Sequence, residues 1–458
     1  MGLRLYNSLT RSKDELIPAA PPAVSLYTCG PTVYNYQHVG NYRTYIFEDL
    51  LVRTLKLLGY APKRVLNITD VGHLTSQGDE GEDKMEVGAA REGKTAWDVA
   101  KFYTDAFLAD WKKLGLLDAD EMPRATGYIK EQIAMVAELD KKGFVYKTSD
   151  GLYFDTSKFP RYGEMMTKEH LEGLKSGARV EANPEKRHNT DFALWKFSPA
   201  GAKRQMEWDS PWGKGFPGWH IECSAMARKI LGDSIDIHCG GIDHVPVHHT
   251  NEIAQSEGAT GKPFSRFWLH GEFLLMNNAK MAKSAGGFVK LADLEEKGFS
   301  PLDYKYMCYT AHYRKQLDFT WESLESAKTA RRRLRDAAQA LPAATKADAA
   351  ASARLREALA DDLNAPGALA AVWDALKSSC EPGAKRAFLD EAESALALGL
   401  FAAETEAAVP AEVAALVASR AEAKAKKDFA ESDRIRKRIE DMGWLVKDGK
   451  DGSKAVKK

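Results

Sequence analysis

Two stretches of this chain carry the residue types that a phosphate-handling site needs. They span residues 27–41 and 280–287. The candidates are His38, Gly40 and Asn41 in the first stretch and Lys280 and Lys283 in the second. Imidazole, amide and ammonium groups can stabilise negative charge on phosphate oxygens, and glycine lets the backbone come close to them. Each stretch alone also fits a polar turn or a solvated loop, so the interpretation depends on the pair.

The first stretch lies between a predicted strand and a predicted helix. Residues 23–27 have the alternation and the β-branched and aromatic content of a buried strand, and apolar residues recur with helical spacing from Ile46 until Gly59. In an α/β sheet, this order places backbone N–H groups and the positive end of a helix at the carboxyl edge of the strand. We therefore expect a phosphate to bind at this edge.

Together the two stretches resemble the paired HIGH and KMSKS motifs of class I aminoacyl-tRNA synthetases, written here as His-Val-Gly-Asn and Lys-Met-Ala-Lys-Ser. Residues 67–70, 219–226 and 248–252 are similar to segments of one family in that class, the cysteinyl-tRNA synthetases. The resemblance spans nearly the whole chain. It implies a ligase that activates L-cysteine with ATP to cysteinyl-adenylate and pyrophosphate, and then transfers cysteine to the 3′ end of cysteine tRNA.

The resemblance also implies roles for single residues. In-line attack on the α-phosphate of ATP requires positioning and charge stabilisation more than acid–base chemistry. The implied catalytic residues are His38, Asn41, Lys280 and Lys283, and the ATP-binding set adds Gly40, Gly241 and Asp243. The implied wall of the cysteine pocket is Gly30, Thr69 and Trp219, although core packing would also account for Thr69. Mg²⁺ is expected with ATP.

The same resemblance implies one zinc ion per chain. Its ligands would be Cys29, Cys223, His248 and Glu252, while His249, His244, His238 and Cys239 are competing candidates. A hydrocarbon pocket separates near-isosteres such as cysteine and serine by only about 1–3 kcal/mol. A soft thiolate suits Zn²⁺ far better than a hydroxyl does, which removes the need for an editing domain.

The pattern along the chain predicts an α/β fold with a Rossmann-like parallel-sheet catalytic domain, a connective insertion, a helical bundle and a small C-terminal tRNA-binding domain. The expected divisions are residues 1–122 and 211–275 for the two catalytic halves, 123–210 for the insertion, 276–322 for the lysine-loop and stem-contact region, 323–405 for the bundle and 406–458 for anticodon recognition. The acidic, glycine-containing segment after Asp70 is expected to be a mobile loop.

Composition limits the alternatives. The formal net charge is zero, so any nucleic-acid surface must be local, and five scattered cysteines argue against a disulfide framework. The start of the chain lacks a signal-peptide pattern and no stretch approaches a membrane span, so we expect a cytoplasmic monomer. The basic residues around Arg434, next to Phe429 and Trp444, could bind anticodon bases or form a solvated helix face.

Two other functions fit parts of this pattern. A related cysteine ligase could pass the adenylate to a small amine, but the long helical and basic C-terminal region argues against so small an acceptor. A non-catalytic RNA-binding paralogue is the second alternative, and the presence of His38, Lys280 and Lys283 argues against it.

Overall fold

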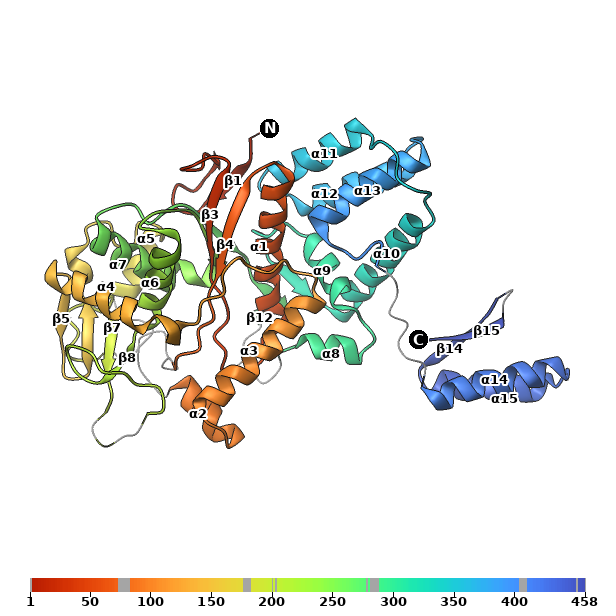
Figure 1. Cartoon of the computed structure of the whole chain (residues 1–458), viewed down its shortest axis with the longest axis horizontal. Helices are drawn as coiled ribbons and strands as arrows, with labels where there is room; N and C mark the ends of the chain where they lie inside the picture. The colour runs from red at the N-terminus through yellow and green to blue at the C-terminus, as the bar shows by residue number, and fades with distance from the viewer. Residues whose placement is uncertain are drawn as a thin grey trace.

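The computed structural model describes residues 2–72, 83–175, 183–199, 201, 204–276, 279–280, 288–402, 410–449 and 452–457. At its centre is a parallel sheet with the strand order β10-β9-β3-β4 (Figure 1). The strands are β3 (Ala23–Thr28), β4 (Ala61–Leu66), β9 (Ile235–Gly241) and β10 (Ser265–Gly271). Leu26 of β3 lies opposite Ile237 of β9, so two segments far apart in the sequence end at one edge of the sheet. The predicted parallel α/β sheet is confirmed.

Helix α1 (Val39–Leu57) connects β3 to β4 and is buried along most of its length. Two buried ion pairs hold it. Glu48 Oε2 lies 3.0 Å from Arg64 Nη2 of β4, and Asp49 Oδ2 lies 3.0 Å from Lys305 Nζ of α9 (Pro301–Tyr309). Removing one partner of such a pair leaves an uncompensated buried charge, which is strongly destabilising. The two pairs therefore hold α1 against the sheet on one side and α9 on the other.

Shorter elements surround the first half of the sheet. They are the antiparallel pair β1 (Arg4–Asn7) and β2 (Ser12–Glu15), and the helices α2 (Lys84–Glu92) and α3 (Ala96–Lys113). The apolar face of α3 packs with α1, since Phe107 and Trp111 contact Tyr45. In the second half, α7 (Thr250–Thr260) connects β9 to β10.

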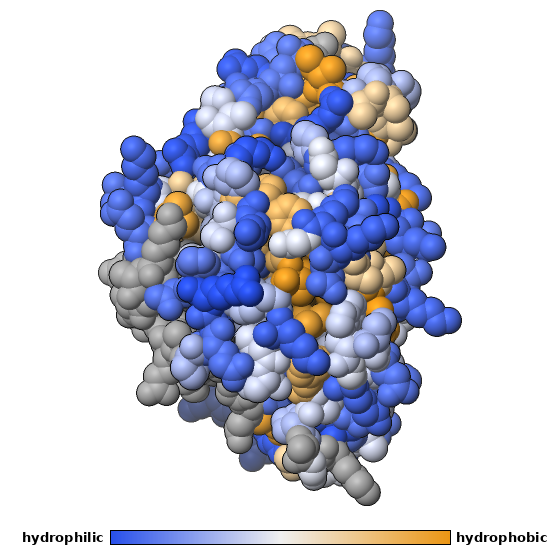
Figure 2. Space-filling view, turned by 90° about the vertical axis from the view of Figure 1, so that its left-hand side faces the viewer, coloured by the Kyte–Doolittle hydropathy of each residue, from blue (hydrophilic) through white to orange (hydrophobic). Residues whose placement is uncertain are grey.

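The region around the predicted insertion, residues 123–210, contains a separate antiparallel sheet with the strand order β5-β6-β7-β8, whose last strand lies just after that range. Its elements are α4 (Ile129–Lys141), β5 (Val145–Lys147), β6 (Gly151–Phe154), α5 (Lys168–Lys175), β7 (Phe192–Phe197) and β8 (Gly215–Pro217). Helix α6 (Trp219–Leu231) then leads back to β9. Figure 2 shows the side of the molecule that carries the insertion, where a band of apolar side chains interrupts a mainly hydrophilic surface.

A small three-stranded sheet follows β10 and leads into residues 280–287, the stretch with Lys280 and Lys283, which we call the lysine loop. Its strands are β11 (Leu274–Met276), β12 (Ala279–Lys280) and β13 (Leu317–Phe319), in the order β12-β11-β13. Helices α8 (Leu291–Glu296) and α9 lie between β12 and β13 in the sequence. The chain from β12 to β13 therefore begins and ends beside β11, because β11 pairs with both of these strands.

The helical bundle consists of α10 (Trp321–Gln339), α11 (Ala349–Ala360), α12 (Ala365–Lys377) and α13 (Pro382–Leu396). We expected a separate domain, but the apolar core runs without a break from α1 into these helices. The sequence pattern predicts that Leu324, Ala327 and Leu334 share the apolar face of α10 and that Arg331 lies on another face, which is wrong for Arg331. Its side chain is buried and its Nε donates to Asp303 Oδ1 of α9 at 2.7 Å. The bundle is thus fastened to the catalytic half by packing and by a buried ion pair.

The C-terminal part has its own small core. Helices α14 (Ala411–Ala425) and α15 (Phe429–Asp441) pack with the hairpin β14 (Trp444–Gly449) and β15 (Gly452–Lys457). Its buried apolar side chains are Val413, Ile435, Ile439 and Trp444. In Figure 1 these elements lie at the lower right, below the helical bundle. None of the helices in the described ranges is long and apolar enough to cross a membrane.

Candidate active site and metal cluster

His38 precedes the first turn of α1 and caps it. Its Nδ1 accepts a hydrogen bond from the N–H of Asn41 at 3.2 Å, and its own N–H donates to Asn41 Oδ1 at 3.2 Å. A Cβ on Gly40 would lie 2.9 Å from His38 Nδ1, so the close approach of the imidazole favours glycine at this position. The three residues predicted to bind phosphate therefore come together at the positive end of a long helix.

The base of the lysine loop lies against the same helix end. His38 forms an antiparallel bridge with Lys290, and the N–H of Val39 donates to the carbonyl of Val289 at 2.8 Å. The backbone of Lys280 forms part of β12, whereas Lys283 lies outside the described residues. The segment after the loop is thus fixed beside His38, and the contact of the two lysines with phosphate stays a prediction.

Asn67 links two of the residues predicted to wall the cysteine pocket. Its Oδ1 accepts from the N–H of Gly30 at 2.9 Å, and its Nδ2 donates to Thr69 Oγ1 at 3.0 Å. A Cβ on Gly30 would lie 1.7 Å from the carbonyl oxygen of Asn67, so only glycine fits. The third residue, Trp219, begins α6, and its ring centroid is 4.6 Å from that of His248. Our sequence reasoning missed Asn67, although its position between a strand end and Thr69 was a usable signal.

The two candidate ribose ligands lie at the end of β9. A Cβ on Gly241 would lie 2.5 Å from Asp243 Oδ1, so the two residues are adjacent. The sequence predicts a strand over residues 234–238 and a tight turn over residues 239–243, and the start of this predicted turn is wrong. The strand continues to Gly241 because β10 pairs with it that far, Gly271 lying opposite Gly241. The 3₁₀ turn Ile242–His244 follows.

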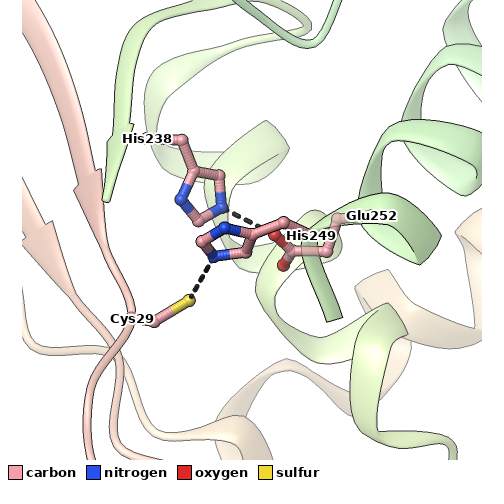
Figure 3. Close-up of side chains that lie close together, drawn as sticks. All are labelled: Cys29, His238, His249 and Glu252. Carbon is pink, nitrogen blue, oxygen red and sulfur yellow. Dashed lines mark hydrogen bonds and ion pairs between the residues drawn. The ribbon is translucent and has the colours of Figure 1, made fainter. Parts of the chain in front are cut away.

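Buried cysteine, histidine and glutamate side chains gather at the carboxyl edge of the parallel sheet. One group, with all donor atoms within 4.8 Å of one another, consists of Cys29, Cys223 and His248, and a second consists of Cys29, His238, His249 and Glu252 (Figure 3). We call these six residues the metal cluster. All six side chains are buried. Thiolate, imidazole and carboxylate are typical zinc ligands, so the cluster is compatible with a metal site.

The metal cluster contains all four predicted ligands and two of the competing ones. Glu252 Oε1 lies 3.5 Å from His248 Nε2, while Glu252 Oε2 lies 2.6 Å from His238 Nε2. His248 belongs to the π-helical turn Val245–His249 and Glu252 to α7, so the pair spans a junction instead of one regular helix. His249 Nε2 lies 3.4 Å from Cys29 Sγ. Among the described residues, His244 and Cys239 belong to neither group.

Burial shifts the pKa values of side chains in the metal cluster. Burial and a hydrogen bond to Cys223 raise the pKa of the Cys29 thiol well above its ordinary value. Burial also raises the pKa of Glu252, against the opposing charge of His238, and burial with four neighbouring histidines lowers the pKa of His249. The neutral forms are therefore favoured. A bound cation would reverse this for the thiol and the carboxylate, because metal ligands bind in their deprotonated form.

Comparison with known proteins gives consistent results for both ends of the chain. The family described as tRNA synthetases class I (C) catalytic domain matches residues 16–329, and the cysteinyl-tRNA ligase anticodon binding domain matches residues 406–454. A solved structure, methionyl-tRNA synthetase of Mycobacterium tuberculosis in complex with methionyl-adenylate, superposes with a TM-score of 0.55 at 14% identity. It covers 82% of this chain and 91% of that one. This likeness shows that the fold is shared.

Curated relatives match the chain from end to end. Cysteine–tRNA ligase 1 of Burkholderia lata is 51% identical over 456 residues, which cover 99% of this chain and 97% of that protein. Cysteine–tRNA ligase of Treponema denticola is 42% identical over 483 residues, covering 98% of each. The chain belongs to the cysteine–tRNA ligase family of class I tRNA synthetases.

Proposed function

We propose that this protein is a cysteine–tRNA ligase, which joins L-cysteine to cysteine tRNA through cysteinyl-adenylate. The observation that carries the proposal is the position of the metal cluster. Cys29 of this cluster directly follows β3, and His38 and Asn41 lie at the start of α1, the helix that follows the same strand, so the proposed thiol-binding and phosphate-binding groups both come after one strand end. This is the arrangement that activation of cysteine by ATP requires.

For activation, we assign the phosphates of ATP to the helix end and to the lysine loop. His38, Gly40 and Asn41 bind phosphate oxygens, and Lys280 and Lys283 stabilise the charge that builds up as pyrophosphate leaves. Gly241 and Asp243 bind the ribose. Mg²⁺ accompanies ATP and neutralises part of its charge. The His38 and Asn41 side chains cap the helix through acceptor atoms, His38 Nδ1 and Asn41 Oδ1, so donation to phosphate is assigned to His38 Nε2 and Asn41 Nδ2.

For cysteine, we assign the metal cluster a zinc ion held by Cys29, Cys223, His248 and Glu252. Two thiolates, one imidazole and one carboxylate suit the preferences of Zn²⁺. When bound there, zinc would coordinate the substrate thiolate and discriminate against the hydroxyl of serine. His238 holds Glu252, and His249 lies between Cys29 and His270, with its Nδ1 2.8 Å from His270 Nε2. Such outer contacts orient metal ligands. Gly30, Thr69 and Trp219 close the pocket around the amino acid.

For the tRNA, we assign anticodon recognition to the C-terminal part. The Phe429 side chain is 62% exposed, and cationic side chains of α15 lie on the same element. Exposed aromatic and cationic side chains together are suited to unpaired bases. The Arg434 side chain is 79% exposed and pairs with Glu431 at 2.8 Å, and we assign it to a phosphate of the tRNA that would replace this carboxylate.

Removal of the C-terminal part should separate the two half-reactions. A chain that ends at Ala402 is expected to keep cysteine-dependent pyrophosphate exchange within about two-fold, since the removed part has its own core. Aminoacylation should fall by at least about ten-fold because anticodon contacts are lost. Both rates are measured on the same preparation. Loss of exchange in a truncated chain with an unchanged circular dichroism spectrum would contradict this division.

Zinc binding should release protons. Because the pKa values of the Cys29 and Cys223 thiols are raised above an ordinary value that already lies above neutral pH, both thiols hold protons near pH 7 without metal and must lose them on binding, so affinity should rise with pH. We expect about two protons per zinc at pH 7. Calorimetric titration of metal-free protein in two buffers of different ionisation heat measures this number. A pH-independent affinity with no proton release would contradict the assigned ligands.

The decisive test of the function is ATP–pyrophosphate exchange with cysteine, followed by charging of cysteine tRNA. Cysteine-dependent pyrophosphate exchange together with charging of cysteine tRNA supports the ligase. Exchange without charging of any tRNA would favour a ligase that uses a small amine acceptor, and tRNA binding without exchange would favour a non-catalytic RNA-binding protein. A chelator that abolishes exchange, with recovery on adding Zn²⁺, would support the metal assignment.

A further inference from the structure

The side chain of Arg43 lies buried between α1 and the base of the lysine loop. Arg43 follows Asn41 by two residues, and it is only 4% exposed. Resting on the proposed function, we propose that Arg43 is a positioning residue for cysteine activation. Its guanidinium fixes the chain segments that carry the lysine loop relative to the helix end that carries His38 and Asn41.

The guanidinium donates to four backbone carbonyls from two separate connections. Nη1 donates to the carbonyls of Glu272, at 2.9 Å, and of Phe273, which lie between β10 and β11. Nη2 donates to the carbonyls of His312, at 3.4 Å, and of Lys315, which lie between α9 and β13. One side chain thus joins both connections to α1.

These two connections determine where the lysine loop begins. Leu274, directly after the first connection, pairs with Leu317, directly after the second, and the next residue of β11, Leu275, pairs with Lys280. Leu275, which pairs with Lys280, is therefore two residues from Phe273, whose carbonyl Arg43 binds. Because short strands leave little freedom, a shift of either connection moves β11 and with it Lys280.

A second set of contacts, made by Tyr313, holds the connection between α9 and β13. The Tyr313 ring stacks on Phe47 of α1, with centroids 4.9 Å apart and planes at 14°. Its hydroxyl donates to Asp362 Oδ1 at 2.7 Å, and the N–H of Glu272 donates to its carbonyl at 2.8 Å. The two connections are therefore also bonded to each other, so the whole unit moves with α1.

Ordinary packing does not account for the choice of arginine. Lysine would supply the same charge, but its ammonium is a point donor and cannot span four acceptors in two directions as the planar guanidinium does. These part-buried carbonyls would lose the donor that joins them to α1, which costs free energy and lets the connections shift. Arg43 thus acts through the geometry of its hydrogen bonds, and losing these bonds should change the position of the lysine loop.

The test compares Arg43→Lys with Arg53→Lys, a matched change on the same helix. Arg53 also donates to two backbone carbonyls, of Gly115 at 2.9 Å and Ser394 at 3.1 Å, but neither lies near the lysine loop. In single-turnover experiments, Arg43→Lys should slow cysteinyl-adenylate formation by about ten- to a hundred-fold. The apparent affinity for cysteine and the rate of transfer from preformed adenylate to tRNA should change less than about three-fold. Arg53→Lys should leave adenylate formation within about two-fold.

The outcomes separate this inference from the proposed function. If unchanged protein makes no cysteinyl-adenylate, the proposed function fails. If it does, and Arg43→Lys forms adenylate within two-fold of it, or Arg53→Lys is slowed equally, the positioning role is overturned. Should Arg43→Lys fail to fold, Tyr313→Phe is the second variant, because it keeps the stacked ring and removes only the hydroxyl. We then expect about a three-fold slower adenylation, and an unchanged rate would overturn the inference.

Discussion

Replacement of Lys283 by alanine is expected to slow the formation of cysteinyl-adenylate by roughly two to three orders of magnitude. The ammonium group interacts most strongly with phosphate oxygens when charge has built up during in-line displacement. Its removal should therefore lower the rate much more than it weakens the binding of ATP in the ground state. Losing one preorganised charge contact of this type costs about 3–4 kcal/mol of transition-state stabilisation.

Single-turnover kinetics of the two half-reactions measures this effect. Transfer from preformed cysteinyl-adenylate to tRNA should be largely preserved in Lys283→Ala, because pyrophosphate has already left. Lys297→Ala is the control, since Lys297 lies just after α8, outside the loop, with its ammonium over the ring of Trp321. An adenylation rate within a few-fold of normal in Lys283→Ala, or equal slowing of transfer, would show that the loop has another role.

The part of the fold nearest the phosphate site could be predicted because its signals are local. A β-branched run, a glycine-containing turn and helical apolar spacing predicted a strand, a loop and a helix, and the structure has them as β3, residues 29–38 and α1. The errors came from tertiary contacts. The strand β9 outlasts its predicted end because β10 offers hydrogen bonds, and Arg331 is buried because Asp303 neutralises it.

The metal cluster shows where a linear pattern stops being informative. Parallel topology explains how Cys29 reaches the residues of α6 and α7, and that was predictable from two strands ending at one edge. Which histidines join the cluster could not be predicted from the sequence. His238 in the middle of β9 and His249 at the end of a π-helical turn both belong to the same cluster, and only the folded geometry pairs His238 with Glu252. For the same reason Arg43 could not be found, because its partners are backbone carbonyls, which no side-chain pattern marks.

The second large effect concerns Cys223, a buried thiol of the metal cluster. In Cys223→Ala, one of the four proposed zinc ligands is missing, and the affinity for zinc should fall by at least about a hundred-fold. Exchange with cysteine should fall with it, and added Zn²⁺ should restore part of the rate if the remaining ligands still bind. Metal content by mass spectrometry and exchange rates are measured on the same samples. A variant with full metal content would remove Cys223 from the site.

Cys239→Ala is the matched control, because Cys239 of β9 is a buried thiol like Cys223 of α6 but belongs to neither group of donor atoms among the described residues. It should keep its zinc and its activity within about two-fold, apart from the stability lost with a buried side chain. Serine gives the sharper distinction. Because a soft thiolate binds zinc far better than a hydroxyl, the unchanged protein and Cys239→Ala should both activate cysteine and leave serine unused. In Cys223→Ala the preference for cysteine should shrink toward the roughly 10- to 200-fold that packing alone provides. If selectivity survives the loss of metal, the thiol is recognised by the pocket of Gly30, Thr69 and Trp219, and zinc has a structural role.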